Sequence, residues 1–404
     1  MKALVISSSP FLNCRLGKIT SDLLKYFKLN NISVSAAVWH HDVNYFMPAD
    51  DGKFYYDIDG ENICEIMPIP YPLNFNNIKQ KSTIALYEII NKIKPDIVIS
   101  VSDCDEIDFI CAVKQILDFK WLGILTVDNF PINEKNLDYI GLMDSVVVTN
   151  SQSKKNIIEK IPGCNPDFYS YGYDDKIFKY NENIHDNFTV LNVSKNAQIY
   201  NIGAFIEAFA KFSKTKNDVI CRMHYNINDP GEYDVDLLVS RYKIQDKIIF
   251  EDRYISIKDG LTASEMADFF NDGDVLVDCS VGSATSMGIM EAVACGCVPL
   301  VNYCGSNMDL LLNNVLNSQN IIDSLDYIGK NEEVLKISNP DNIVDKLNEL
   351  YSLWKVDRCL FNNIKNKYSV EIKRYNNREF LNKIKEKMFS VIKDDSKVIC
   401  IDEF

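Results

Sequence analysis

The stretch SVGSATSMGIMEAVACGCVPLV, residues 280–301, combines small and hydroxyl residues with a single carboxylate before a short apolar strand. Ser283, Ser286 and Gly288 lie where a helix is expected to begin, and Glu291 follows just inside that helix. Small residues let a ligand approach the backbone closely, and the N-terminus of a helix attracts phosphate. Serine is also an ordinary helix cap. Taken alone, the stretch therefore predicts either an anion site or a plain capped helix.

These residues need a scaffold, and the rest of the sequence predicts one made of alternating strands and helices. In the first 180 residues the predicted strands are KALVIS, ISVSAAVW, DIVISVS, WLGILTVD and SVVVTN, and FYSYGYD is predicted as a further strand or strand end. Helical spacing of apolar residues lies between them, as in ITSDLLKYFKLN. After a polar segment at 179–187, which we interpret as a linker, the strands FTVLNVS, DVICRMHY, KIIFED, DVLVDCS and VPLVNY follow. This alternation predicts mostly parallel sheets covered by helices.

The length of the chain indicates two such domains. Single cores rarely exceed roughly 250–300 residues, and this chain has 404. We predict an α/β protein with two Rossmann-like doubly wound domains, at 1–182 and 183–370, that face a cleft lined by the carboxyl ends of both sheets. The charged, helical tail at 371–404 is predicted to pack back on the first domain.

Composition excludes several classes of partner. The net charge of −14 argues against nucleic acid and against an anionic membrane surface as partners. The 12 cysteines are scattered without a C-x-x-C pair, so they predict buried thiols in a reducing compartment and no metal site. The N-terminal apolar run soon turns polar, and it is too short for a signal peptide or a membrane span. We therefore expect a cytoplasmic protein with no integral membrane segment.

The order of motifs resembles that of retaining glycosyltransferases with the GT-B fold, in the large family usually numbered four. In that family the second domain opens with a strand, an arginine, a lysine five residues later, and a helix ending in Glu-Ala-Phe. VLNVSKNAQIYNIGAFIEAF keeps this spacing, with Lys195 and Tyr200 at the two cationic positions. The resemblance implies that Lys195 holds the diphosphate of a sugar donor, where Tyr200 donates a hydrogen bond without a charge. A solvated loop lysine is the alternative for Lys195.

The segment at 280–301 resembles the family signature of two glutamates eight positions apart, E-G-F-G-L-P-P-L-E-A-M-A-C-G. Glu291 occupies the second position, and Ser283 stands where the first glutamate would be. The resemblance implies that Glu291 hydrogen-bonds the ribose of the nucleotide. It also implies donor contacts from the backbone of Ser286, Met287 and Gly288. The first glutamate is associated with the transferred sugar, so its replacement by Ser283 puts donor orientation and turnover in question.

Three further segments resemble parts of the family pattern. SSSPFLNCRLGK resembles an N-terminal loop whose glycine approaches the donor near the acceptor, which implies a role for Gly17. LTVDNFP resembles a segment with an acidic residue at the cleft, which implies that Asp128 contacts the donor or acceptor sugar. A simple turn is the alternative for Gly17, and a helix-cap or turn aspartate is the alternative for Asp128. FEDRYISIKDG, at 250–260, lies where the nucleobase usually rests.

These likenesses imply transfer of a sugar from a nucleoside diphosphate sugar to a glycan or lipid-linked acceptor, with retention and without a metal or other cofactor. The predicted catalytic residues are Lys195, Glu291 and Asp128. The predicted donor-binding residues are Gly17, Tyr200, Ser283, Ser286, Met287, Gly288 and Glu291. Replacement of one glutamate and one cation leaves a second hypothesis, a degenerate protein that serves as a binding or partner subunit. A sugar-nucleotide epimerase is a third, and the donor, the acceptor and any homo-oligomer stay undetermined.

Overall fold

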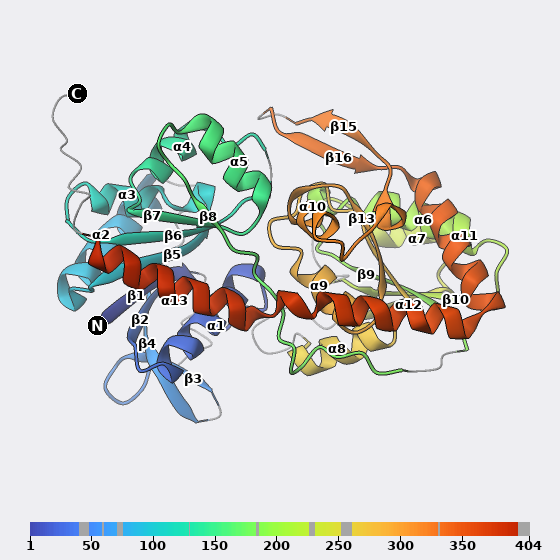
Figure 1. Cartoon of the computed structure of the whole chain (residues 1–404), viewed down its shortest axis with the longest axis horizontal. Coiled ribbons are helices and arrows are strands. Elements are labelled where there is room, and N and C mark those ends of the chain that lie inside the picture. Colours follow the sequence, from blue (N-terminus) through green and yellow to red (C-terminus); the bar gives the residue numbers. More distant parts are fainter. Residues whose placement is uncertain are drawn as a thin grey trace. The chain divides into compact units, whose positions relative to one another are not determined.

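A computed structural model of the protein describes residues 1–39, 48–58, 60–70, 76–128, 130–182, 186–225, 231–251, 261–329 and 332–394. The chain forms two compact units. Unit 1 comprises Met1–Val127, Ile132–Tyr169 and Glu379–Phe404, and unit 2 comprises Asp128–Pro131 and Ser170–Arg378. Figure 1 shows each unit as a sheet flanked by helices. That the chain folds as separate domains with boundaries at 182/183 and 370/371 stays a prediction.

Unit 1 contains a mostly parallel sheet. In spatial order its described strands are β3 (Phe54–Ile58), β4 (Glu61–Pro68), β2 (Ser33–Trp39), β1 (Lys2–Ser8), β5 (Ile97–Asp103), β6 (Trp121–Thr126), β7 (Ser145–Val148) and β8 (Asp167–Phe168). Only the β3–β4 pair among them is antiparallel. The central strands β1, β5 and β6 are buried along almost their whole length, because helices cover both faces of such a sheet.

The helices of unit 1 carry apolar residues at three- and four-residue spacing. They are α1 (Arg15–Leu29), α2 (Asn76–Ile93), α3 (Asp108–Lys114), α4 (Glu134–Gly141), α5 (Ser151–Lys160) and most of α13 (Asn377–Lys393). In α13 the buried residues Phe380, Ile384 and Met388 form one stripe. The Lys385 ammonium donates to Asn30 Oδ1 at 2.9 Å, and Lys387 pairs with Asp167 at 2.7 Å. The last described helix therefore packs on unit 1.

Unit 2 contains an all-parallel sheet. In spatial order its described strands are β11 (Ile248–Glu251), β10 (Val219–His224), β9 (Phe188–Val193), β12 (Val275–Asp278), β13 (Val298–Asn302) and β14 (Ile321–Ile322). The carboxyl ends of parallel strands meet at one edge of a sheet. The loops after β9, β12 and β13 are therefore neighbours, and they carry most of the residues singled out above.

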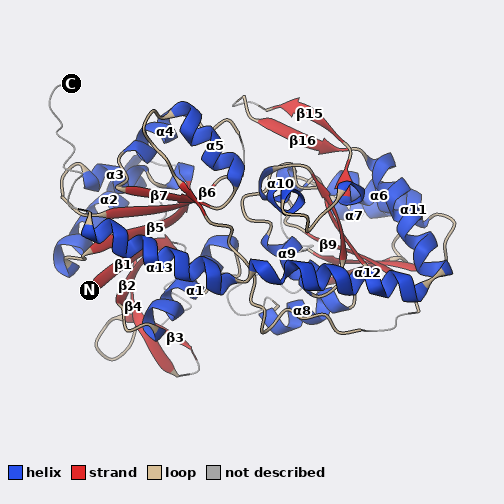
Figure 2. Ribbon diagram, viewed as in Figure 1, coloured by secondary structure: helices blue, strands red, loops and turns tan. Residues whose placement is uncertain are grey.

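Helices cover the unit 2 sheet and close its core, as Figure 2 shows. They are α6 (Ile202–Ser213), α7 (Val235–Tyr242), α8 (Ala263–Asn271), α9 (Met287–Ala294), α10 (Gly305–Leu312), α11 (Pro340–Val356) and α12 (Arg358–Glu371). The Phe188 ring meets Phe212 at 6.0 Å and Trp354 at 5.6 Å, in edge-to-face geometry. A buried ion pair of 3.2 Å joins Lys365 of α12 to Asp274, just before β12.

A two-stranded hairpin, β15 (Ser324–Ile328) and β16 (Val334–Ser338), lies outside the main sheet of unit 2. One strand of it contacts the loop after β12, because the Lys336 N–H donates to the Val281 carbonyl at 3.4 Å. Asn302 Nδ2 in turn donates to the Lys336 carbonyl at 2.9 Å. The hairpin therefore supports the loop 279–286, which leads into α9.

The fold-class prediction is confirmed, because both units are α/β with Rossmann-like parallel sheets. The apolar runs predicted as strands become β1, β2, β5, β6 and β7 in unit 1, and β9 to β13 in unit 2. Of the predicted strand FYSYGYD only Phe168 lies in a strand, β8. The β3–β4 and β15–β16 pairs were not predicted. Within the described ranges, no helix is long and apolar enough to cross a membrane. Most of the predicted nucleobase segment, residues 252–260, lies outside the described residues.

Candidate functional site

Helix α9 begins with a backbone that is well arranged for an anion. Its N-cap, Ser286, adopts a left-handed conformation with φ of 48° and ψ of 26°, and its side chain does not cap the helix. The first helical hydrogen bond of the turn runs from the Met290 N–H to the Ser286 carbonyl at 2.9 Å. The N–H groups before it in the first turn have no partner within the helix. They are those of Met287, Gly288 and Ile289.

Gly288 leaves room for a ligand beside this turn. An ideal Cβ placed on Gly288 would have no described atom within 4 Å, and the residue is only half-buried. A helical glycine costs stability relative to alanine, and packing in unit 2 does not require one here. The open space is consistent with the predicted approach of a donor to this backbone.

The serine side chains near α9 form an internal network. Ser286 Oγ lies 2.5 Å from Ser306 Oγ and donates to Asn307 Oδ1. Ser283 Oγ lies 3.0 Å from Ser306 Oγ, and the Ser306 N–H donates to the Ser283 carbonyl at 2.8 Å. Ser283 and Ser286 are both buried. Their hydroxyls join the starts of α9 and α10, so contacts of this loop with a ligand are expected from its backbone.

Glu291 lies one turn after Met287, on the same side of α9. Its side chain is buried, with 6% of the residue exposed. Its charge contributes to raising the pKa of the Cys295 thiol, for which burial is the main cause. A buried carboxylate close to the start of a helix is a suitable acceptor for two neighbouring hydroxyls, as the ribose prediction requires.

Lys195 and Tyr200 follow β9 at the same edge of the sheet. Lys195 is exposed, and no hydrogen bond or ion pair of its ammonium is found within the described ranges. Tyr200 ends the short helix Gln198–Tyr200 and is half-buried. The Val281 N–H donates to the Ile199 carbonyl at 2.8 Å, which joins this loop to the one before α9. The structure thus brings the lysine loop and the α9 loop together, while their roles in binding stay predictions.

Asp128 belongs by its contacts to unit 2. The carbonyl of Phe130, two residues later, accepts the Val334 N–H of β16 at 2.8 Å. The Asp128 charge also contributes to raising the pKa of Cys304, the residue before α10, although burial dominates that shift. Asp128 and Phe130 therefore lie near Cys304 and β16, which surround the loop 279–286.

Gly17 lies in unit 1, in the first turn of α1. A Cβ there would come within 2.4 Å of the Leu12 carbonyl oxygen and 2.8 Å of the Ser9 carbonyl oxygen. The Gly17 N–H donates to the Cys14 thiol at 3.4 Å. The glycine is therefore required by the close packing of the β1–α1 loop against the first turn of α1. A donor contact by Gly17 stays a prediction.

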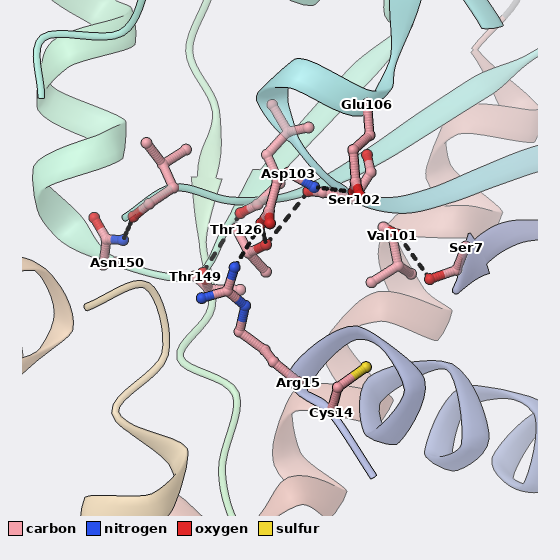
Figure 3. Close-up of polar contacts among 12 residues, drawn as sticks. Ser7, Cys14, Arg15, Val101, Ser102, Asp103, Glu106, Thr126, Thr149 and Asn150 are labelled. Carbon is pink, nitrogen blue, oxygen red and sulfur yellow. Dashed lines mark hydrogen bonds and ion pairs between the residues drawn. The ribbon is translucent and has the colours of Figure 1, made fainter. Parts of the chain in front are cut away.

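A polar cluster lies beside this loop at the carboxyl end of the unit 1 sheet (Figure 3). Arg15 Nη2 lies 2.7 Å from Asp103 Oδ1, which also accepts the Thr126 hydroxyl. The Asp103 N–H donates to Glu106 Oε2 at 3.0 Å. The Arg15 and Asp103 side chains are 25% and 38% exposed. The pair fixes the start of α1 to the end of β5 and still faces solvent.

Sequence reasoning missed two polar residues at the edge of the unit 2 sheet. Asp278 ends β12, and Asn201 is the N-cap of α6 with a left-handed φ of 47°. Asn201 Nδ2 is buried and has no hydrogen-bond partner within the described ranges. Asp278 ends the apolar run of β12 as Asp103 ends that of β5, so its type and position in the sequence did not single it out.

A small cavity of about 170 Å³ lies elsewhere in unit 2, between β10, β11 and α8. Arg222 enters it and pairs with Asp272, and its Nη2 is 3.7 Å from a Glu251 carboxylate oxygen. None of the predicted site residues lines this cavity. Among the described residues, no three His, Cys, Asp or Glu side chains are grouped as metal ligands would be.

Two Rossmann-like units with these loops define a GT-B fold, the fold class of many glycosyltransferases. Sucrose-phosphate synthase from Thermosynechococcus elongatus matches with a TM-score of 0.74 and 13% identity, over 96% of this chain and 99% of that one. A glycosyltransferase from Rickettsia africae ESF-5 matches with a TM-score of 0.71 and 15% identity, over 97% and 99%. HepE from Anabaena, in complex with UDP and glucose, matches with a TM-score of 0.66 and 12% identity, over 96% of this chain and 99% of that one.

The GT-B prediction is thus confirmed at the level of the fold. No protein-family model matches the sequence, and no curated protein matches it. Identities of 12–15% establish the fold and leave the reaction to be argued from the residues.

Proposed function

We propose that the protein is a glycosyltransferase that moves a sugar from a nucleoside diphosphate sugar to a glycan or lipid-linked acceptor. The observation that carries the proposal is the start of α9, where the backbone at Gly288 is open and the N-cap side chain is engaged elsewhere. Such a turn binds phosphate through its N–H groups and the helix dipole. Glu291 and the loop of Lys195 lie beside it and supply the ribose acceptor and the ammonium.

The main chemical task is to stabilise the departing diphosphate. As the bond between the anomeric carbon and the diphosphate breaks, negative charge develops on the phosphate oxygen. The acceptor hydroxyl forms the new bond to the anomeric carbon, and its proton passes to the departing diphosphate. The α9 N–H groups and the exposed Lys195 ammonium neutralise that charge, so the transfer proceeds without a bound metal or other cofactor. The transferred sugar keeps its configuration. Glu291 holds the ribose and takes no part in proton transfer.

The acceptor is assigned to unit 1. The Arg15–Asp103 pair lies at the carboxyl end of its sheet, where ligands of such sheets bind, and it is partly exposed. A carboxylate beside a guanidinium offers both an acceptor and donors to the hydroxyls of a sugar. Asp128 provides a second carboxylate for the donor or acceptor sugar. Cytoplasmic location and any homo-oligomer stay predictions.

The alternative is a degenerate protein that binds a partner and catalyses nothing. It is favoured by Ser283, whose hydroxyl is occupied by Ser286 and Ser306, and by Tyr200, which lacks the charge of a lysine. Both hypotheses predict the same fold, so only activity separates them.

The test is a transfer and hydrolysis assay with UDP-, GDP- and ADP-sugars and a panel of glycan acceptors. UDP-glucose is the first donor, because the HepE complexes contain UDP, glucose and UDP-glucose. Turnover that falls at least tenfold in Glu291→Gln, a variant that keeps the shape of the side chain, supports the proposal. Absence of binding and turnover with every donor contradicts it and favours the partner hypothesis. Isomerisation of the donor without an acceptor identifies an epimerase.

A further inference from the structure

Asp278 is an acidic residue at the edge of the unit 2 sheet that none of the predicted roles uses. It ends β12, between β9 and β13, and is partly buried. Its hydrogen-bond donors are the N–H of Ser280, at 2.8 Å from Oδ1, and the hydroxyl of the same residue. No lysine or arginine of the described ranges forms an ion pair with it. A carboxyl in this position is therefore held in place but left without a compensating charge.

A chain of hydrogen bonds connects Asp278 to the start of α9. The Ser280 carbonyl, next to the Asp278 contact, accepts the Cys304 thiol at 3.5 Å. Cys304 Sγ lies 4.0 Å from Asn307 Nδ2, and Asn307 Oδ1 accepts the Ser286 hydroxyl. Asp278 therefore belongs to the same polar assembly as the N-cap of α9, where the diphosphate is proposed to bind.

The electrostatics of Asp278 allow a neutral, hydroxyl-bearing partner. Burial raises the pKa of Asp278, because removing a carboxylate from water disfavours its charged form. Burial is the main cause of the raised pKa of Cys304; the charges of Asp278 and Asp128 add to it, and Lys336 acts in the opposite direction. The Lys336 ammonium already pairs with Asp326. A hydroxyl satisfies the Asp278 carboxyl in either protonation state and brings no further charge.

We propose that the Asp278 carboxyl accepts a hydrogen bond from a hydroxyl of the transferred sugar, and that it thereby positions the sugar of the donor. This inference rests on the proposed function. The sugar is covalently joined to the diphosphate, so it must lie beside the start of α9. Ser283, at the signature position, has its hydroxyl bonded to Ser286 and Ser306 and is 9% exposed. Asp278 is the partly exposed acidic group that remains on β12 beside this loop.

The test compares the dissociation constants of UDP and UDP-glucose by calorimetry, with the GDP/GDP-mannose and ADP/ADP-glucose pairs used where the uridine pair does not bind. Asp278→Asn keeps an oxygen for the Ser280 N–H and removes the charge. Asp278→Ser, which also offers an acceptor to that N–H, is the second variant if Asn impairs folding. Asp274→Asn is the matched control, because Asp274 precedes the same strand and pairs with Lys365 away from its carboxyl end.

In Asp278→Asn the dissociation constant of the nucleotide sugar is expected to rise roughly tenfold or more, as for loss of a hydrogen bond to a charged group. The dissociation constant of the nucleoside diphosphate is expected to change by less than about twofold. Asp274→Asn is expected to lower thermal stability and leave the ratio of the two constants unchanged. The inference is overturned if Asp278→Asn leaves the ratio of the two dissociation constants unchanged, whether neither constant changes or both rise equally. If wild-type protein binds none of the three pairs, the proposed function itself fails, which distinguishes the two failures.

Discussion

Replacing Gly288 with alanine separates the stability of unit 2 from its predicted ability to bind phosphate. An alanine Cβ at this position would have no described atom within 4 Å. Alanine is favoured over glycine in a helix by about 0.5–1 kcal/mol. Gly288→Ala is therefore expected to raise the free energy of unfolding by up to that amount. For a unit of this size the melting temperature rises by roughly 1–4 °C.

Binding is expected to change in the opposite direction. The added methyl group occupies the space through which a phosphate oxygen reaches the α9 N–H groups. Loss of one charge-assisted hydrogen bond costs about 1.5–3 kcal/mol, which corresponds to a roughly 10- to 150-fold weaker dissociation constant. Calorimetric titration with UDP, or with the nucleoside diphosphate that wild-type protein binds best, measures this loss. A thermal melt of the same sample measures the stability.

The control is Gly141→Ala in α4, because Gly141 is also helical and its Cβ would also have no described atom within 4 Å. It lies in unit 1 and is expected to change stability similarly without altering nucleotide affinity. The reasoning is refuted if Gly288→Ala binds the diphosphate as tightly as wild-type protein. It is refuted equally if Gly141→Ala weakens binding to the same extent.

Three further predictions follow from single residues. Lys195→Ala is expected to weaken binding of the nucleoside diphosphate roughly tenfold at low salt and less at high salt, because an exposed ammonium is screened by ions. An unchanged dissociation constant at low salt contradicts the role of Lys195. Gly17→Ala is expected to cost about 1–3 kcal/mol of stability through its clash with the Leu12 carbonyl, measured by urea unfolding, and a neutral result refutes the packing account. Burial raises the pKa of Cys297 to about 12 from 9.0, so the unfolded chain loses this proton first and stability falls as pH rises from about 9 to 12. At pH 8, mass spectrometry after alkylation should find the exposed Cys359 modified before Cys297, and equal rates would contradict this.

The strands were predictable because parallel sheets covered on both faces leave continuous apolar runs in the sequence. The start of α9 was predictable for a similar local reason, since small and hydroxyl residues precede an apolar helix. Gly296, just after the C-cap of this helix, adopts the left-handed conformation that glycine favours there, with a φ of 90°. Each of these features depends on residues that are close together along the chain.

The network of Ser283 could not be predicted, because its partner Ser306 lies 23 residues away and reaches it only when α10 follows β13. Ser283 was predicted from the sequence to contact the ligand, whereas in the structure its hydroxyl forms hydrogen bonds with Ser286 and Ser306. The hairpins β3–β4 and β15–β16 were missed although apolar and polar residues partly alternate in both. Their strands are short and lie among polar residues, so the alternation of apolar and polar residues is too brief to distinguish a strand from a loop.

The central claim is that the start of α9 and Glu291 together bind a nucleoside diphosphate, and an experimental structure with UDP, GDP or ADP bound tests it most directly. We predict a phosphate oxygen within hydrogen-bonding distance of the Gly288 N–H, about 2.7–3.2 Å, and the ribose hydroxyls on the Glu291 carboxylate. A nucleotide bound elsewhere on the chain, with the α9 N-terminus free of phosphate, would contradict the account.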